Sequence, residues 1–590
     1  MTVPKRLEAL RIAMKKAGID AWIVPSSDPH QSEYVANRWS GRSWISGFSG
    51  SAGTVIILAD KAGLWTDSRY FLQAAAELSG SGIDLYKEGL PETPSMEAWL
   101  KSELAEGSVV GFDGAVMSVS QVNKLRDQLA GAHIQLKYDT DLLDAIWPDR
   151  EAMPGNPVFL LDDSITGETC VSKVKRICEK MIAAGAQYTI LPALDDIAWT
   201  FNMRGADVEY NPVAYAWAVI ARDSVHLFIR ENKLSADVKK KMEQDKVTLH
   251  DYDAFLPWLS KLNGAVILID PERTNQKIRD AIPGTCTVTE KPSIAFDLKA
   301  VKNETELQGV RHAHIRDGAA MVKWLYWLEN NINTGKHTEI TLADKLEAFR
   351  RENDKIVGLS FTTIAGYRGN GAIVHYSAKP ETAAEVKPEG LLLMDSGGQY
   401  MDGTTDITRT ISLGKPTDEE KHCFTLVLKG HIDLAKAIFP KGYNGSQVDT
   451  FARAAMWADY KNYGHGTGHG VGHFLNVHEG PQRIRPENTV PLEPGMLTSN
   501  EPGIYIEGKF GIRIENLVIT IVKKVNEYGT FYGFETVTLC PISLDLIDVD
   551  MLTGDEKAWL NTYHKQVYEK LSPLLNAGEK DWLKNQTRAI

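Results

Sequence analysis

Four histidines crowd into one glycine-rich stretch, GHGTGHGVGHFLNVHEG, as His465, His469, His473 and His478. Its five glycines before residue 473 argue against a helix, where each costs about 1 kcal/mol relative to alanine. In an extended chain, His465, His469 and His473 would share one face and glycine would leave the other face bare. A bare face lets a backbone or ligand come close. The stretch therefore favours metal or substrate binding over a glycine-rich loop with surface histidines.

Two further segments each place a pair of acids at the ends of apolar runs. GLLLMDSGGQYMDGTTDITRTISLG indicates a hairpin with Asp395 on one strand and Asp406 on the other. GMLTSNEPGIYIEGKFGIRIENLVIT repeats this plan with Glu501 and Glu515. An aspartate in a turn usually caps backbone amides, but burial of an uncompensated carboxylate is costly. We therefore expect two similar halves that present four carboxylates, with the histidine stretch between them.

The four carboxylates need positive charge if they share one pocket, because they would otherwise repel one another. Oxygen ligands with one imidazole suit Mn²⁺ or Co²⁺ better than a thiolate-rich zinc site. Two such ions can hold a hydroxide between them and polarise a carbonyl, which is the chemistry of amide or phosphate-ester hydrolysis. These motifs contain little Lys or Arg to hold a phosphate, which favours an amide. The alternative is four structural carboxylates in salt bridges.

An internal repeat indicates how the earlier part of the chain is organised. RLEALRIAMKKAGIDAWIVP (residues 6–25) resembles KVKRICEKMIAAGAQYTILP (residues 173–192). Both indicate an amphipathic helix, a glycine stop, a short apolar strand and a proline. We expect two related α/β domains, at about 1–158 and 159–300, with chance similarity of two helix–glycine–strand units as the alternative.

A long helix opens the third domain, which we place at 301–525. Asn303 can cap this helix, Glu306 completes a capping box, and the apolar period continues to about Leu328. Residues 526–590 indicate strands followed by a helix, as an extension of this domain. The fold class is α/β (α+β).

The composition is that of an ordinary soluble protein of 590 residues, with 43% apolar and 24% charged residues. This length predicts three or four domains. A net charge of −12 argues against nucleic acid or an anionic membrane as partner. The N-terminus lacks the apolar segment of a signal peptide, and no run is long enough to cross a membrane. The scattered cysteines form no CxxC and fit the reducing cytoplasm; they are Cys170, Cys178, Cys286, Cys423 and Cys540.

Taken together, the motifs resemble those of the pita-bread metallopeptidases, specifically the cytosolic three-domain aminopeptidase P (Xaa-Pro aminopeptidase) family. The resemblance extends over essentially the whole chain. It is carried by FSGSAGTVII, LWTDSRYFLQA, AIVHY, DSGGQYMDGTTDITRT, GHGTGHGVGHFLNVHEGP, SNEPGIY and GIRIEN. It implies two creatinase-like N-terminal domains followed by a pita-bread catalytic domain with a C-terminal extension.

The resemblance also implies a set of metal ligands, namely Asp395, Asp406, His469, Glu501 and Glu515. Asp406 and Glu515 would bridge two divalent ions, Asp395 would bind one ion only, and His469 with Glu501 would bind the other. The family usually uses Mn²⁺, and Co²⁺ or Zn²⁺ are the alternatives.

Further residues resemble those that handle substrate in the family. Glu501 would be the general base. His478, and His375 in AIVHY, resemble a pair that binds substrate or moves protons, whereas His473 matches no functional position. The remaining matches are a pocket histidine, two supporting residues and a first-domain arginine that reaches substrate across a dimer; these are His465, Tyr505, Arg513 and Arg69.

The function that the resemblance implies is a cytoplasmic exopeptidase, active as a homodimer. It would release the N-terminal residue from peptides with proline in second position, by attack of a metal-bridging hydroxide. Three alternatives are set against it. The first is a prolidase-type X-Pro dipeptidase, which has the same ligands. The second is a non-catalytic pita-bread module that binds peptides, which shares the fold. The third is methionine aminopeptidase, which the two N-terminal domains disfavour because that enzyme lacks them.

Overall fold

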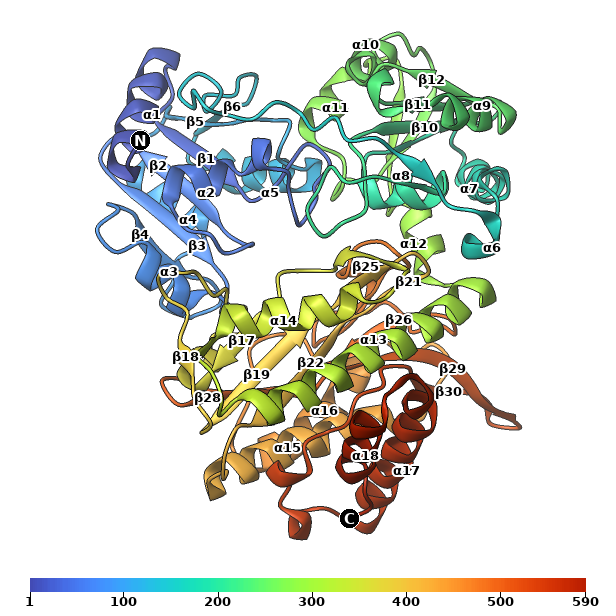
Figure 1. Ribbon diagram of the computed structural model, residues 1–590. Helices are drawn as coiled ribbons and strands as arrows, with labels where there is room; N and C mark the ends of the chain where they lie inside the picture. Colours follow the sequence, from blue (N-terminus) through green and yellow to red (C-terminus); the bar gives the residue numbers. More distant parts are fainter. The chain divides into compact units, whose positions relative to one another are not determined.

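The computed structural model describes residues 1–590, which divide into two compact units (Figure 1). The N-terminal unit comprises Met1–Asp162 and Glu168–Phe296, and the C-terminal unit comprises Asp163–Gly167 and Asp297–Ile590. None of the helices combines the length and the apolar character that a bilayer span requires.

The N-terminal unit contains two six-stranded sheets of the same topology, visible in blue and in green in Figure 1. In each, the central strand pairs antiparallel with one neighbour and parallel with the other. In spatial order, the first sheet is β4 (Asp84–Lys87), β3 (Ala62–Thr66), β2 (Thr54–Leu58), β1 (Ala21–Pro25), β5 (Val109–Phe112) and β6 (Gln135–Lys137). The second is β12 (Val247–His250), β11 (Val225–Phe228), β10 (Trp217–Ala221), β8 (Tyr188–Leu191), β13 (Val266–Ile269) and β14 (Thr287–Glu290).

The repeat seen in the sequence is the unit that leads into each central strand. Helix α1 (Val3–Ala17) precedes β1, and helix α7 (Cys170–Ala183) precedes β8. Gly18 and Gly185 follow these helices with φ of 67° and 79°, a left-handed conformation that glycine adopts without strain. The predicted order of helix, glycine and strand is confirmed in both places, and the shared sheet topology supports two related α/β domains.

Six helices of ten or more residues accompany the strands of the C-terminal unit. The capping box predicted at Asn303 and Glu306 is confirmed, and it opens α13 (Glu304–Asn331). Helix α13 packs against α14 (Glu339–Arg351), and α15 (Asp418–Ala435) packs against α16 (Gly445–Ala458). Helices α17 (Gly554–Leu571) and α18 (Ala577–Gln586) end the chain, where the sequence indicated a single helix.

The strands of this unit follow one plan twice. Strand β19 (Leu391–Ser396) pairs antiparallel with β22 (Ile407–Ser412), and β26 (Leu497–Asn500) pairs antiparallel with β29 (Asn516–Asn526). Both predicted hairpins are therefore present. Each also carries a smaller hairpin inserted between its strands. The insertions are β20 (Gly398–Tyr400) with β21 (Gly403–Thr404), and β27 (Gly503–Ile506) with β28 (Phe510–Arg513).

Further strands complete the two sheets that contain the paired strands β19–β22 and β26–β29. Strand β17 (Ile364–Tyr367) pairs with β19 to give the order β17-β19-β22. The larger sheet has the order β23-β30-β29-β26-β24-β25, in which the other members are β23 (Phe439–Pro440), β24 (Gly468–Gly470), β25 (Glu479–Ile484) and β30 (Gly529–Thr536). The two acidic segments and the histidine stretch therefore all belong to the sheets of one unit.

Candidate metal centre

Four carboxylates sit at equivalent places in the two repeated halves of the C-terminal unit. Asp395 lies near the end of β19 and Asp406 directly precedes β22, while Glu501 directly follows β26 and Glu515 directly precedes β29. Asp395, Asp406 and Glu515 are buried, and the Glu501 side chain is 17% exposed. The strand pairings bring two acids from each half to adjoining strand ends.

His469 joins these acids from the short strand β24. Its Nε2 lies 3.4 Å from Oδ2 of Asp406 and 3.5 Å from Oε1 of Glu501. Ligand atoms of Asp406, His469 and Glu515 all lie within 4.8 Å of one another. The Nδ1 of His469 is 2.9 Å from the Gly470 carbonyl oxygen, which can only accept a hydrogen bond. The ring proton therefore sits on Nδ1 and the Nε2 lone pair faces the acids, as metal ligation requires.

The pKa values of the four carboxyl groups indicate a pocket that cations would stabilise. Burial raises the pKa of Asp406 to about 6 and that of Glu501 to about 7. Burial, with the nearby Asp406 and Glu501, holds the pKa of Glu515 well above its usual range, and burial also raises the pKa of Asp395. Burial lowers the pKa of His469 to about 4, so its imidazole is neutral at pH 7. Oδ1 of Asp395 is buried without a hydrogen-bond partner. This donor set fits hard divalent cations.

Arg513 supplies positive charge directly beside the acids. Arg513 is buried, and it donates to Oδ2 of Asp395 at 2.5 Å and to the Tyr505 hydroxyl at 2.7 Å. Its Nε also donates to Oγ1 of Thr408 at 3.1 Å, and Thr408 in turn donates to Oε2 of Glu515 at 2.8 Å. Arg513 thus orients one acid directly and a second through Thr408.

The sequence-predicted histidines separate in the structure. The Nε2 of His465 is 2.8 Å from the Tyr505 hydroxyl, so His465 joins the Arg513 network. The ring of His478 stands edge-on to the ring of His469, with their centroids 4.4 Å apart. Both residues therefore adjoin the metal centre without being part of the cluster that could hold an ion.

The prediction that His465, His469 and His473 share one face of an extended strand is wrong. Strand β24 covers only Gly468–Gly470, so His465 and His473 lie outside it. His473 is buried, and its Nε2 lies 3.1 Å from the position that a Cβ of Gly309 in α13 would occupy. The chain leaves the strand on both sides of His469, so the three histidines have different neighbours.

Close approach of other backbones over the glycines is confirmed. A Cβ on Gly468 would lie 1.9 Å from the Ser499 carbonyl oxygen in β26. A Cβ on Gly470 would lie 2.4 Å from the carbonyl oxygen of Glu479 in β25. Any larger residue would push these strands apart, so glycine on both sides of His469 allows the ligand strand to lie between its neighbours.

His375 lies in the turn that follows the 3₁₀ helix Arg368–Ala372, and its side chain is half-buried. Its neighbours in sequence, Ile373 and Tyr376, belong to the same apolar cluster as Tyr505. The structure thus brings the His375 segment to a residue that Arg513 contacts.

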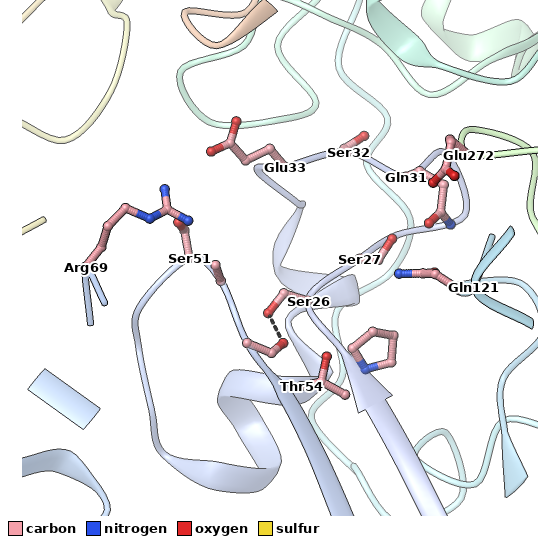
Figure 2. Close-up of a pocket in the computed structure, with 13 residues that line it drawn as sticks. Ser26, Ser27, Gln31, Ser32, Glu33, Ser51, Thr54, Arg69, Gln121 and Glu272 are labelled. Atoms are coloured by element: carbon pink, nitrogen blue, oxygen red, sulfur yellow. Dashed lines mark hydrogen bonds between the residues drawn. The ribbon is translucent and has the colours of Figure 1, made fainter. Parts of the chain in front are cut away.

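Arg69 belongs to the N-terminal unit, unlike the metal ligands. It forms two hydrogen bonds with Asp67, from Nε at 2.8 Å and from a terminal nitrogen at 2.7 Å. It also lines a polar cavity of about 400 Å³. Figure 2 shows Arg69 at one end of this cavity and Gln121 and Glu272 at the other.

Two supporting hydroxyl residues were missed from the sequence. The Ser499 hydroxyl donates to Oε1 of Glu501 at 3.1 Å and accepts from the His469 amide at 2.9 Å. Thr408, described above, plays a similar part beside Glu515. Each lies two residues from an acid of the cluster, Glu501 or Asp406. Because a spacing of two residues places side chains on one face of a strand, this spacing could have identified both residues as neighbours of the acids.

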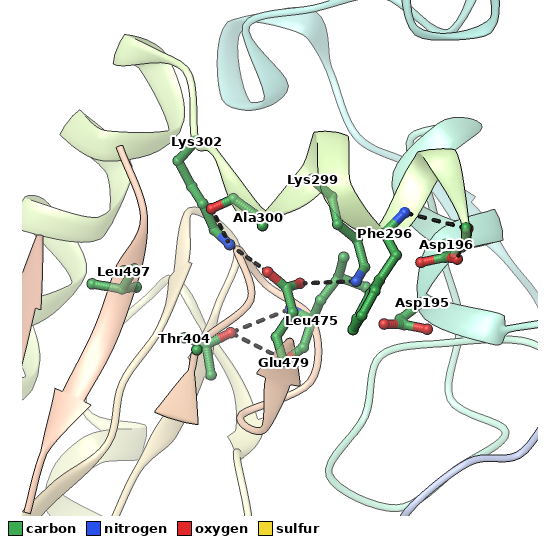
Figure 3. Close-up of polar contacts among 12 residues, drawn as sticks. Asp195, Asp196, Phe296, Lys299, Ala300, Lys302, Thr404, Leu475, Glu479 and Leu497 are labelled. Atoms are coloured by element: carbon green, nitrogen blue, oxygen red, sulfur yellow. Dashed lines mark hydrogen bonds and ion pairs between the residues drawn. The ribbon is translucent and has the colours of Figure 1, made fainter. Parts of the chain in front are cut away.

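A buried ion cluster next to His478 was also missed. Glu479 begins β25, and its carboxylate contacts two lysines, with Oε2 3.7 Å from Lys299 Nζ and Oε1 hydrogen-bonded to Lys302 Nζ (Figure 3). All three side chains are at most 1% exposed. The cluster holds the start of β25, and therefore the backbone next to His478.

Comparison with known families agrees with this architecture. The model for metallopeptidase family M24 matches residues 308–521, and that for the C-terminal region of peptidase M24 matches 530–590. The creatinase/prolidase N-terminal domain matches twice, over 6–145 and 149–306. The protein is thus an M24 metallopeptidase with two creatinase-like domains before its catalytic domain.

Individual relatives specify the family further. A probable Xaa-Pro aminopeptidase P of Laccaria bicolor is 45% identical over 599 residues, covering 99% of this chain and 93% of that protein. Aminopeptidase P2 of Arabidopsis thaliana is 40% identical, covering 100% and 89%. The crystal structure of X-prolyl aminopeptidase from Caenorhabditis elegans, described as a cytosolic enzyme with a di-nuclear active site, matches with 36% identity, a TM-score of 0.96 and complete coverage of both chains. The chain belongs to the Xaa-Pro aminopeptidase P family, which confirms the resemblance seen in its motifs.

Proposed function

We propose that this protein is a metal-dependent exopeptidase that releases the N-terminal residue from peptides with proline in second position. The observation that carries the proposal is the cluster of four buried or largely buried carboxylates around the neutral His469. The cluster lies in a chain that belongs to the Xaa-Pro aminopeptidase P family over its full length.

The residues that would hold two divalent ions are Asp395, Asp406, His469, Glu501 and Glu515. The burial of the acids, the orphaned Oδ1 of Asp395 and the tautomer of His469 support this set. We propose Mn²⁺ as the ion. When bound, the ions supply Lewis-acid polarisation of the scissile carbonyl and activation of water at neutral pH.

The chain's own residues position the reactants and move the protons. Glu501, held by the Ser499 hydroxyl, takes the proton of the attacking water and passes it to the leaving nitrogen. Arg513 and Tyr505 keep Asp395 in place. His375 and His478 flank the proline and its tertiary amide. The proline nitrogen carries no hydrogen in this amide, and it leaves only after it has been protonated. His465 acts through Tyr505.

The finer organisation belongs to the same proposal. We place the domains at 1–158, 159–300, 301–525 and 526–590, in keeping with the ranges of the four matching family models. The protein would act as a homodimer in the cytoplasm, with Arg69 reaching the peptide across the dimer. The description of the nematode relative as cytosolic supports this location.

Substrate choice tests the proposal against its alternatives. A peptide Xaa-Pro-Pro should lose one N-terminal residue, whereas Xaa-Ala-Pro should be a poor substrate. Acetylation of the amino terminus should block cleavage, because an exopeptidase recognises the free amine. Faster cleavage of Xaa-Pro dipeptides than of tripeptides would indicate a prolidase, and cleavage of neither would indicate a peptide-binding module.

A further inference from the structure

A buried carboxylate that takes no part in the proposed mechanism lies beside the segment that carries His375. Glu339 is the first residue of α14, where the helix dipole favours negative charge, and none of its surface is exposed. Burying a carboxylate is costly unless polar groups compensate it. Its surroundings must therefore supply hydrogen-bond donors to the carboxylate.

Four donors converge on Glu339 from one stretch of chain. They are the Tyr367 amide at 2.8 Å, the Asn370 side-chain amide at 2.9 Å, the Tyr376 hydroxyl at 2.7 Å and the Ala384 amide at 2.8 Å. This stretch connects β17 to β19, and the longest part of it has no regular structure. Glu339 thus fixes the path of an otherwise irregular connection.

The same connection is pressed against the strand that carries Arg513. A Cβ on Gly511 in β28 would lie only 1.7 Å from the Gly371 carbonyl oxygen, so the two backbones touch. Tyr376 belongs to the apolar cluster that includes Tyr505, the partner of Arg513. The segment that Glu339 holds therefore lies beside the residues that orient Asp395.

We infer that Glu339 is a positioning residue, which acts through the Tyr376 hydroxyl to keep the adjacent His375 in register with the metal centre. The inference rests on the substrate role proposed for His375. A displacement of about 1 Å in a positioned group can cost on the order of 100-fold in rate. Loss of one anchoring bond should therefore reduce turnover while the metal ligands stay in place.

Tyr376→Phe tests this inference with the smallest perturbation, since it removes only the hydroxyl. We expect kcat/KM for Xaa-Pro-Pro to fall about tenfold with unchanged metal content. The matched control is Tyr400→Phe, because the buried Tyr400 hydroxyl donates at 2.8 Å to a different buried acid, Asp317. The control should stay within about twofold of the wild type. Equal effects of both substitutions, or loss of metal in Tyr376→Phe, would overturn the inference.

A double-mutant cycle separates positioning from a general structural role. If Tyr376 acts through His375, Tyr376→Phe should cause no further loss of kcat/KM in a His375→Ala background. Losses that multiply would refute the inference, as would a His375→Ala variant with wild-type kinetics. In either case, cleavage of Xaa-Pro-Pro by the wild type leaves the proposed function standing. Glu339→Gln should show a larger loss than Tyr376→Phe, and the tyrosine variant decides if the glutamine variant does not fold.

Discussion

Metal binding to protein that has been freed of metal with a chelator should release more protons at pH 6 than at pH 8. Burial raises the pKa of Glu501 to about 7 and that of Asp406 to about 6. At pH 6, Glu501 is then mostly protonated and Asp406 about half protonated, whereas both are ionised at pH 8. Ligands must lose their protons to bind a metal. These two acids together therefore release about one more proton per chain at pH 6 than at pH 8.

The direction of the effect on affinity follows from the same groups. Protons compete with the metal below the raised pKa values, so affinity for Mn²⁺ should weaken as the pH falls from 8 through 7 and 6. In the metal-free protein, the raised pKa values of these acids also affect the free energy of unfolding. Their contribution to stability is fully present below the ordinary pKa of a carboxyl group and is lost as the pH rises through 6 to 7. His469 adds nothing to the difference, because a pKa of about 4 leaves it neutral at both pH values.

Isothermal titration calorimetry measures the released protons. Mn²⁺ is titrated into chelated protein at each pH, in two buffers that differ in ionisation enthalpy. The control is Asp402→Asn, since Asp402 is buried but already paired with Arg316 and Lys355. This variant should keep the wild-type difference between pH 6 and pH 8. Equal proton release at the two pH values would refute the account of uncompensated acids sharing one pocket.

Four substitutions probe the roles of single residues. Glu501→Gln should lower turnover by at least roughly 10²-fold, and near-normal turnover would mean that the base is misassigned. His469→Ala should abolish activity, whereas His473→Ala should retain most of it; equal damage would refute the sorting of these histidines. Lys302→Met should reduce the free energy of unfolding by about 3 kcal/mol in chemical denaturation, because Glu479 loses its nearest cation. Unchanged stability would show that Lys299 alone compensates Glu479.

The pattern of strands and acids could be predicted because it is local and occurs twice. An apolar run that ends in an acid predicts a strand with a buried acid at its end. Both halves have this pattern, at Asp395 and at Glu501. The inserted hairpins could not be predicted in the same way. Strands β20 and β21 have three and two residues, too few for alternation to show.

Tertiary partners of buried polar residues were beyond the reach of the sequence. Glu339 has the sequence signature of an ordinary acid in the first turn of a helix, yet its donors lie 28 to 45 residues further along the chain. Glu479 meets Lys302 across 177 residues. His469 and His473 each follow a glycine, yet in the fold His469 lies beside the acids and His473 lies against α13. Local patterns identify candidate ligands, but the network that holds them depends on distant contacts.

The most direct test of the central claim is to titrate metal and activity together. Protein dialysed against chelator is reloaded stepwise with Mn²⁺, and bound metal and Xaa-Pro-Pro cleavage are measured on the same samples. Five ligands around two ions predict no activity in the metal-free protein, and activity that saturates as bound metal reaches two ions per chain. Full cleavage by protein that has been rigorously freed of metal would contradict the account.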